Sequence, residues 1–252
     1  MLTKNSAAYL AECLRALEAF AEVVIVDNGS SDETLTIASG FSNVIIYEHS
    51  FIGFGPMKNI AIDKASNDWI FSVDSDEIVT PELVSEMLNL KLDSSLIYAV
   101  ERDNYYNRRL IRACSWQNDE VQRLFNRKST RYDDKLVHEG LLMNDGLKTE
   151  RLLGRMKHYT YDNASQLLQK MQHYSTLWAE DRQGNKQSSP VKAVLYGMLT
   201  FFKSYVIKKG WLYGYEGLLI SISNANVVFY KYIKLYEANR SHTFSGVPKQ
   251  KP

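Results

Sequence analysis

In the first hundred residues, segments with the hydrophobic spacing of a helix alternate with short apolar runs typical of a strand. Apolar residues first recur at helical spacing after the polar Asn5 and Ser6, which predicts a capped amphipathic helix carrying Leu10, Cys13, Leu14 and Leu17. The sequence VVIVD at 23–27 is then a continuous β-branched run, typical of a strand buried on both faces in a parallel sheet. The chain therefore opens as a helix followed by a buried strand.

The same alternation continues to residue 90. In the loop NGSSDET, Ser30 and Glu33 have the spacing of a capping box, which predicts that a short helix begins there. Two more strands are predicted, NVIIYEH at 43–49 and WIFSVD at 69–74, with a helix GPMKNIAIDKA between them. Thr80 and Pro81 supply the N-cap and first position of a further helix. Strands alternating with helices predict an α/β fold with a mostly parallel central sheet.

The second half of the chain is organised differently. After Leu96 the pattern loosens into strand-like runs rich in arginine and aromatic residues, and three helices are predicted between Asn163 and Glu237. We therefore expect one domain over 1–160, with a first part at about 1–100 and a second at about 101–160. A helical extension over 161–241 and a disordered polar tail over 242–252 are expected to follow.

Composition narrows the functional classes. Among 252 residues, 30 Lys and Arg nearly balance 29 Asp and Glu, which argues against bulk nucleic-acid binding. Cys13 and Cys114 lack metal-ligand spacing and are expected to be buried thiols in a reducing compartment. The first residues show no secretory signal, and no apolar run is long enough to span a bilayer, so cytoplasmic residence is expected.

Candidate chemistry lies where predicted strands end. Asp27 closes one strand and Asp74 another, and the carboxyl ends of parallel strands share the sheet edge where α/β folds bind ligands. Either aspartate alone could simply cap a turn. The run Asp74-Ser75-Asp76-Glu77, however, packs carboxylates that repel one another unless a cation compensates them. Mg²⁺ or Mn²⁺, shared with substrate phosphates, would suit such oxygen ligands and act as a Lewis acid on a nucleoside diphosphate leaving group.

With these residues in view, the chain resembles the inverting glycosyltransferases of family 2. Four segments match the family's pattern in order: TKN at 3–5, VDNGSSDET at 26–34, GFGPMKN at 53–59 and VDSDE at 73–77. The resemblance implies a GT-A nucleotide-diphospho-sugar transferase fold with a C-terminal helical extension. It also implies a metal held by Asp74 and Asp76, of which Asp76 is the direct ligand and a catalytic residue. The residues implied to bind the nucleotide-sugar are Thr3, Asn5, Asp27, Asn28, Lys58, Asp74 and Ser75.

For Lys58, a solvated position on a helix face is the alternative to phosphate binding. One departure concerns the start of the fold: the family normally has a complete strand before TKN, which is absent or nearly so here. A second departure is the missing Q-x-x-R-W signature of processive synthases, which favours a single sugar addition over polymer synthesis.

The later half resembles a narrower branch of that family, the bacterial enzymes that add a sugar to the heptose of the lipopolysaccharide inner core. WQNDEVQRLFNRK at 116–128, LVHEG at 136–140 and the pattern beginning KKGWLYGYEG at 208 carry this resemblance. It implies transfer of glucose from UDP-glucose to a glycan or glycolipid acceptor in cell-envelope biosynthesis.

An inverting transfer needs a general base to take the proton of the acceptor hydroxyl. The resemblance favours Glu139, with Asp119 and Glu120 as alternatives, whereas an ordinary surface pair is the other interpretation of His138 and Glu139. Acceptor binding is expected from Trp116, Arg123 and His138. The basic run that Arg123 begins, continued by Arg127, Lys128 and Arg131, suits a phosphorylated sugar better than nucleic acid.

The C-terminal helices mix aromatic residues with lysines between 201 and 215. This mixture suits peripheral contact with the inner face of the cytoplasmic membrane, although core packing explains the apolar positions equally well. Two other functions compete with glycosyl transfer: a non-catalytic nucleotide- or glycan-binding module, and a nucleotidyltransferase. The Gly-rich basic signature expected of a nucleotidyltransferase is missing near the N-terminus.

Overall fold

A computed structural model describes residues 1–134 and 139–245 of the chain. The chain divides into two compact units, which are described separately. Unit 1 comprises residues 1–104 and 118–160, and unit 2 comprises residues 105–117 together with the chain from residue 161 onward. The insertion of 105–117 into unit 2 interrupts unit 1 in sequence.

The first sheet of unit 1 contains three parallel strands in the order β1-β2-β3. These strands are β1 (Leu2–Thr3), β2 (Val23–Asp27) and β3 (Val44–Glu48), and helices α1 (Ala7–Ala16) and α2 (Thr34–Ser39) connect them. All five residues of β2 are buried, as its β-branched run predicts. Helix α3 (Phe54–Lys64) follows β3. The first strand, expected to be nearly absent, is two residues long.

The second sheet has the order β4-β8-β6-β9-β5, in which β8 pairs antiparallel with β4 and β6, and β9 pairs antiparallel with β5. Its strands are β4 (Trp69–Phe71), β5 (Glu77–Val79), β6 (Leu96–Tyr106), β8 (Asp119–Asn126) and β9 (Lys148–Tyr161), while the short β7 (Arg109–Leu110) pairs with β6. The expectation of a mostly parallel sheet therefore holds only for β1 to β3. Strands β6 and β8 pair antiparallel, so the later strands do not continue the strand-helix alternation.

The main core of unit 1 joins the two sheets through the inner face of α1 and through helix α4 (Pro81–Asn89). Cys13 is fully buried in it as a free thiol, as predicted, and Thr80 caps α4 by accepting a hydrogen bond from the backbone N–H of Leu83. A cavity of about 300 Å³ lies alongside β1, lined by apolar residues of β2, α3 and β4.

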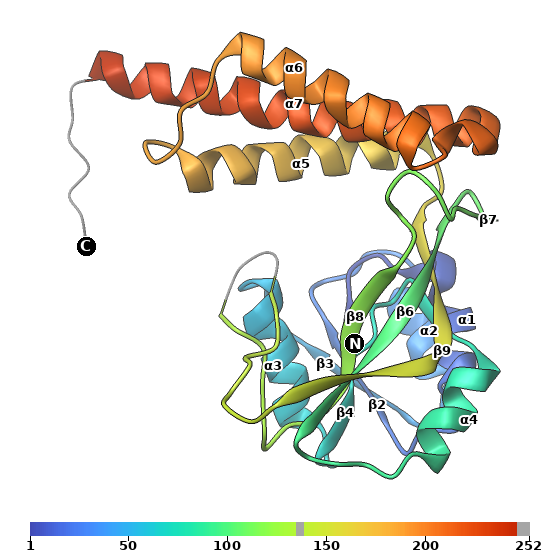
Figure 1. Ribbon diagram of the computed structural model, residues 1–252. Helices are drawn as coiled ribbons and strands as arrows, with labels where there is room; N and C mark the ends of the chain where they lie inside the picture. The colour runs from blue at the N-terminus through green and yellow to red at the C-terminus, as the bar shows by residue number, and fades with distance from the viewer. Residues whose placement is uncertain (135–138, 246–252) are drawn as a thin grey trace. The chain divides into compact units, whose positions relative to one another are not determined.

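Unit 2 is built on three long helices, α5 (Ala164–Arg182), α6 (Pro190–Phe202) and α7 (Gly214–Ser245), which run side by side in Figure 1. A π-helical turn (Lys203–Ile207) and a 3-10 turn (Gly210–Tyr213) join α6 to α7. The segment 105–117 packs on these helices through Ile111, Ala113 and Cys114, which are at most 1% exposed. Cys114 is the second buried free thiol.

The three predicted helices are thus present, and α7 continues to Ser245, into the segment expected to be a disordered tail. Extending an existing helix by one residue costs far less than starting one, so a polar composition alone does not end it. Within the described residues, none of the helices combines the length and apolar character needed to cross a bilayer.

Candidate active site

The segment Thr3–Ser6 links the two acidic loops that the sequence singled out. Thr3 Oγ1 donates to Asp27 Oδ1 at 2.8 Å, and the hydroxyl groups of Ser75 and Ser6 are 2.8 Å apart. Asn5 adopts a left-handed φ of 51°, a conformation that asparagine tolerates, and accepts a hydrogen bond from the Ser31 N–H. The loops after β2 and β4 are therefore held together by one short segment.

Asp27 organises the loop that follows β2. Its buried carboxylate accepts hydrogen bonds from the backbone N–H groups of Gly29 and Ser30 and from the Ser30 hydroxyl. Burial opposes ionisation, but these hydrogen bonds outweigh it and hold the pKa of Asp27 below its usual value. Asn28 belongs to the same loop, and its backbone N–H donates to Thr3 O. The loop is therefore fixed before any ligand binds.

A buried cluster of opposite charges lies behind the loop after β4. Glu77 is fully buried and accepts hydrogen bonds from Arg123 Nη2 and, at 3.0 Å, from Arg102 Nη1. Arg123 Nη2 also donates to Asp74 Oδ2 at 2.7 Å. Burial disfavours the Asp74 carboxylate, but Arg123 and Lys58 overcome that penalty and hold its pKa well below the usual range. Asp74 is therefore committed to cations of the protein itself.

Lys58 joins Asp74 to the predicted base. Its Nζ lies 3.4 Å from Asp74 Oδ1 and 2.8 Å from Glu139 Oε1, over the ring of Tyr132. Burial lowers the pKa of Lys58, but the neighbouring carboxylates more than compensate and raise it to about 12. Asn59, next on α3, exchanges two hydrogen bonds with the Tyr132 backbone and so holds Tyr132 beside Lys58. Lys58 is thus a buried ion-pair partner and not a solvated lysine.

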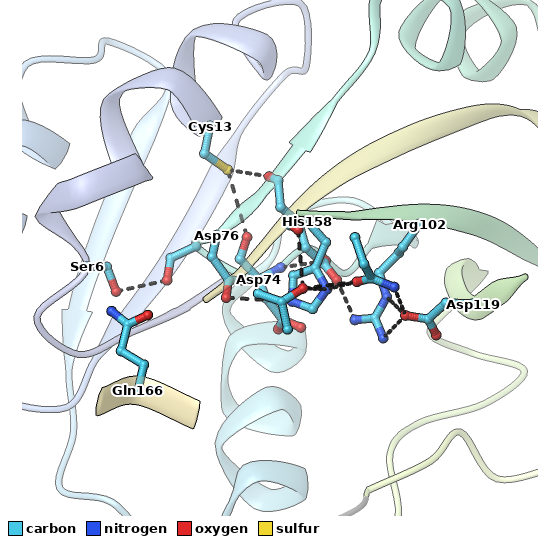
Figure 2. A network of polar contacts seen from close by, with 12 residues as sticks. Ser6, Cys13, Asp74, Asp76, Arg102, Asp119, His158 and Gln166 are labelled. Atoms are coloured by element: carbon cyan, nitrogen blue, oxygen red, sulfur yellow. Dashed lines mark hydrogen bonds and ion pairs between the residues drawn. The ribbon is translucent and has the colours of Figure 1, made fainter. Parts of the chain in front are cut away.

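Asp76 has different surroundings from Asp74. Its carboxylate is 41% exposed, and among the described residues no lysine or arginine pairs with it. His158 Nε2 lies 3.6 Å from Asp76 Oδ2, because β5 and β9 pair antiparallel with Glu77 opposite His158. Figure 2 shows Asp76 and His158 beside Asp74, whose side chain is 36% exposed and differs from Asp76 in its ion pairs with Arg123 and Lys58.

Hydrogen bonds orient the His158 ring and determine which of its nitrogens carries a proton. Asn104 Nδ2 donates to Asp119 Oδ2 at 2.9 Å, which leaves Asn104 Oδ1 facing His158 Nδ1 at 2.6 Å. An amide oxygen can only accept, so Nδ1 carries a proton and Nε2 is left to face Asp76. Asp119 itself is held by Arg102 at 2.8 Å. This chain of contacts orients the imidazole in the way that outer partners orient metal-binding histidines.

The donor set fits a divalent cation that shares its site with a ligand. Two atoms that each lie about 2.1 Å from one cation can be up to about 4.2 Å apart, which accommodates the 3.6 Å between Asp76 and His158. Asp74, predicted as a second metal ligand, has both oxygens engaged by Arg123 and Lys58. Among the described residues no group of three or more His, Cys, Asp or Glu side chains is arranged to hold a metal by itself. Substrate oxygens or waters would complete the coordination.

Arg123 and Trp116, both predicted for acceptor binding, belong to different units. Arg123 points into the buried cluster, with a side chain only 6% exposed. The rest of the basic run is neutralised, since Arg127 and Lys128 pair with Asp68 and Arg131 pairs with Asp63. The run therefore does not form a free basic surface. Trp116 belongs to unit 2, where its ring lies 5.7 Å from that of Tyr161, and His138 lies outside the described residues.

Three polar residues of the cluster were not predicted as site residues: Arg102, Asn104 and His158. They lie on β6 and β9, far in sequence from the acidic run. The single histidine in the strand-like sequence RMKHYTY was the available signal. The other two predicted bases already have partners in the protein. Asp119 is bound by Arg102 and Asn104, and Glu120 lies 3.8 Å from Arg151.

The two acidic loops, Lys58 and Glu139 lie in a segment that is shared with known proteins, and His158 follows just after it. Residues 1–149 match the family described as Glycosyl transferase family 2. The chain belongs to this family. As a family 2 glycosyltransferase, it has the predicted GT-A fold, in which an α/β unit is followed by a helical C-terminal region. Both the family resemblance and the assignment as a glycosyltransferase are confirmed.

Relatives extend the similarity over nearly the whole chain. An uncharacterized glycosyltransferase of Rickettsia felis is 26% identical over 94% of this chain and 88% of its own length. A lipopolysaccharide core biosynthesis glycosyltransferase, LpsC of Rhizobium meliloti, is 27% identical over 92% of this chain and 89% of its own length. The crystal structure of S. aureus TarS 1–349 in complex with UDP-GlcNAc aligns with 97% of this chain and 89% of its own, at 13% identity and a TM-score of 0.45.

Proposed function

We propose that this family 2 glycosyltransferase moves one sugar, glucose from UDP-glucose, onto a glycan or glycolipid acceptor such as the heptose of the lipopolysaccharide core. The observation that carries the proposal is the pairing of an exposed carboxylate, Asp76, with an oriented imidazole, His158, next to the Lys58–Glu139 pair. The similarity to LpsC, whose name assigns it to lipopolysaccharide core biosynthesis, supports the class of acceptor.

The proposed reaction is a single displacement with inversion. The acceptor hydroxyl oxygen attacks the anomeric carbon of the donor sugar, the bond from that carbon to the β-phosphate oxygen breaks, and UDP leaves. Glu139 takes the proton of the hydroxyl as the new bond forms. Lys58, 2.8 Å from Glu139 Oε1, holds that carboxylate in place and brings a positive charge toward the phosphates.

The proposal assigns donor binding to the loops held by Thr3 and Asn5. Asp27 fixes the first loop internally, so its contribution is to position Asn28 and the neighbouring backbone groups for the nucleotide. Ser75, tied to Ser6, presents the acidic loop to the diphosphate. A bound Mg²⁺ or Mn²⁺ would neutralise charge on the departing diphosphate as a Lewis acid, held by Asp76 with His158. Asp74 would steady this arrangement through Arg123.

Two aromatic residues are proposed to bind the acceptor. Trp116 offers an aromatic face suited to a sugar ring, and His138 adjoins the proposed base in sequence. A lipopolysaccharide precursor is anchored in a bilayer, so the proposal includes cytoplasmic residence and peripheral contact with the inner face of the membrane.

Calorimetric binding of UDP, with and without Mn²⁺, tests the donor and metal parts. We expect Mn²⁺-dependent binding that Asp76→Ala abolishes and that His158→Ala weakens. Asp63→Ala is the matched control, because that exposed aspartate on α3 pairs only with Arg131 among the described residues, and it should bind as the parent chain does. Equal binding by all four chains would refute the metal assignment.

Transfer from UDP-glucose to a heptose-containing core oligosaccharide tests the rest. Glu139→Gln should bind UDP normally but transfer glucose at least 100-fold more slowly, in line with the usual contribution of a general base of about 10²–10⁴. Glu120→Gln, which changes an exposed glutamate on β8, is the control. UDP binding without transfer or donor hydrolysis would favour the alternative, a nucleotide-binding module. A nucleotidyltransferase would instead release pyrophosphate from a nucleoside triphosphate.

A further inference from the structure

Helix α6 in unit 2 buries small residues and exposes large apolar ones, whereas a helix at a water-facing surface normally buries its large apolar residues. The residues that it buries against α7 are small: Ala193 and Gly197 are buried, and a Cβ added at Gly197 would lie 3.4 Å from atoms of Ala225 and Phe229. Most of its bulky residues point outward and are between 47% and 67% exposed: Val191, Val194, Leu195, Met198, Leu199 and Phe202. Small residues between helices with large apolar residues outside are typical of helices in contact with lipid.

The apolar surface continues beyond α6. Val206 and Ile207 in the π-helical turn are 44% and 60% exposed, and Trp211 and Leu212 in the 3-10 turn are 55% and 54% exposed. We call these residues together with the outward residues of α6 the α6 face. A monomeric protein in water rarely leaves so many large apolar residues exposed on consecutive elements unless they bind something.

The charges around the α6 face indicate what kind of surface it binds. Between Gln183 and Tyr215 the chain contains five lysines and neither aspartate nor glutamate. Lys192, Lys203 and Lys209 are exposed within or beside the α6 face. Lysines bordering an apolar helix face suit an anionic bilayer surface, where the amines meet lipid headgroups and the apolar side chains enter the acyl boundary. A second copy of this chain would instead bring lysines against lysines.

We propose that the α6 face docks on an anionic phospholipid bilayer, with α6 lying in the plane of the membrane. None of the described helices has the length and apolar character to cross a bilayer, in agreement with an in-plane position. Trp211 and the 63% exposed Tyr215 supply the aromatic side chains that prefer the headgroup level. This inference extends the proposed function by naming the docking surface, but binding to lipid requires neither the donor nor the transfer reaction.

Co-sedimentation with vesicles tests the docking, with the full chain and no substrate present. We expect the chain to sediment with phosphatidylglycerol/phosphatidylethanolamine vesicles and much less with phosphatidylcholine vesicles. The double substitution Leu199→Gln with Phe202→Gln should weaken partitioning on the order of tenfold or more, because it removes apolar burial. Charge removal by Lys203→Gln with Lys209→Gln should weaken it by about fivefold for each lysine. Leu153→Gln, an 89% exposed leucine on β9, is the matched control.

Two further measurements separate the outcomes. Trp211 fluorescence should shift to shorter wavelength on adding anionic vesicles, and Trp211→Phe identifies that signal. UDP binding by the substituted chains should match the parent chain, so loss of docking and loss of donor binding can be told apart. The inference is overturned if the parent chain does not bind anionic vesicles. It is equally overturned if sedimentation equilibrium shows a dimer that Leu199→Gln with Phe202→Gln dissolves while vesicle binding is unchanged.

Discussion

At the scale of residues, the site depends on ion pairs between the carboxylates of Asp74 and Glu77 and a few cations. Glu77 is fully buried, and Arg123 connects it to Asp74. Replacing Arg123 with Met leaves both carboxylates without their shared partner, although Arg102 still binds Glu77. We expect Arg123→Met to lower the free energy of unfolding by about 3 kcal/mol, the low end for a broken buried ion pair.

Urea denaturation measures the effect of Arg123→Met. Lys128→Met is the control, because this lysine is 72% exposed and pairs with Asp68 at the surface, where such pairs contribute about 0–1 kcal/mol. If the two substitutions lowered the unfolding free energy equally, the buried cluster would not be a stabilising feature of unit 1.

The depressed pKa of Asp74 predicts how stability depends on pH. Burial works against the carboxylate, and Arg123 and Lys58 more than reverse that effect. A carboxyl whose pKa is lower in the folded state stabilises the fold above its unfolded pKa of about 3.9, and this contribution is lost as pH falls below that value. The difference in unfolding free energy between the parent chain and Asp74→Asn should therefore shrink between about pH 5 and pH 3. A difference that stayed constant would contradict the assignment.

At the scale of elements, helix α4 lies directly on strand β9. The backbone N–H groups of Leu153 and Gly154 donate to the two carboxylate oxygens of Glu86 on α4. A Cβ added at Gly154 would lie 2.5 Å from Leu83 Cα, a backbone atom that cannot move without shifting the helix. Gly154→Ala should therefore lower the free energy of unfolding by about 1–3 kcal/mol, as overpacking does.

Thermal or urea unfolding of Gly154→Ala can be compared with that of Gly140→Ala. Gly140 has no atom within 4 Å of an added Cβ, so its substitution isolates the loss of glycine flexibility from the steric clash. We expect Gly140→Ala to be neutral or slightly stabilising. Similar losses at both positions would mean that α4 can move away from β9 at little cost.

The elements also explain how far the site could be predicted from sequence. Asp27 and Asp74 lie in compact motifs after strands, and these motifs could be recognised from sequence. The prediction that both strands share the edge of one parallel sheet was wrong, because β2 and β4 belong to different sheets. His158 reaches Asp76 only through the antiparallel pairing of β5 with β9, and local sequence does not encode that long-range register. The prediction for Arg123 assumed that a basic run forms a surface patch, whereas β8 is buried on both faces from Arg123 to Phe125.

At the scale of the whole molecule, the chain passes from unit 1 into unit 2 and back before it finally enters the helices. Residues 105–117 leave unit 1 after β6 and return at β8, and Arg102 pairs with Asp119 across these two strands. Ile111, Ala113 and Cys114, buried in unit 2, would be exposed in a chain that ends at residue 160. We therefore expect residues 1–160 to aggregate when expressed alone.

A second truncated chain tests whether that segment is the cause. Replacing 105–117 by Asn-Gly lets a tight turn join the antiparallel β6 and β8, and it removes the apolar segment along with unit 2. We expect this shortened unit 1 to be monomeric by gel filtration, to unfold cooperatively and to bind UDP with Mn²⁺, because Asp76, His158 and the Lys58–Glu139 pair all lie within it. If it folds but does not bind UDP, donor binding needs residues of unit 2. Aggregation of both truncated chains would instead mean that unit 1 depends on unit 2 for its stability.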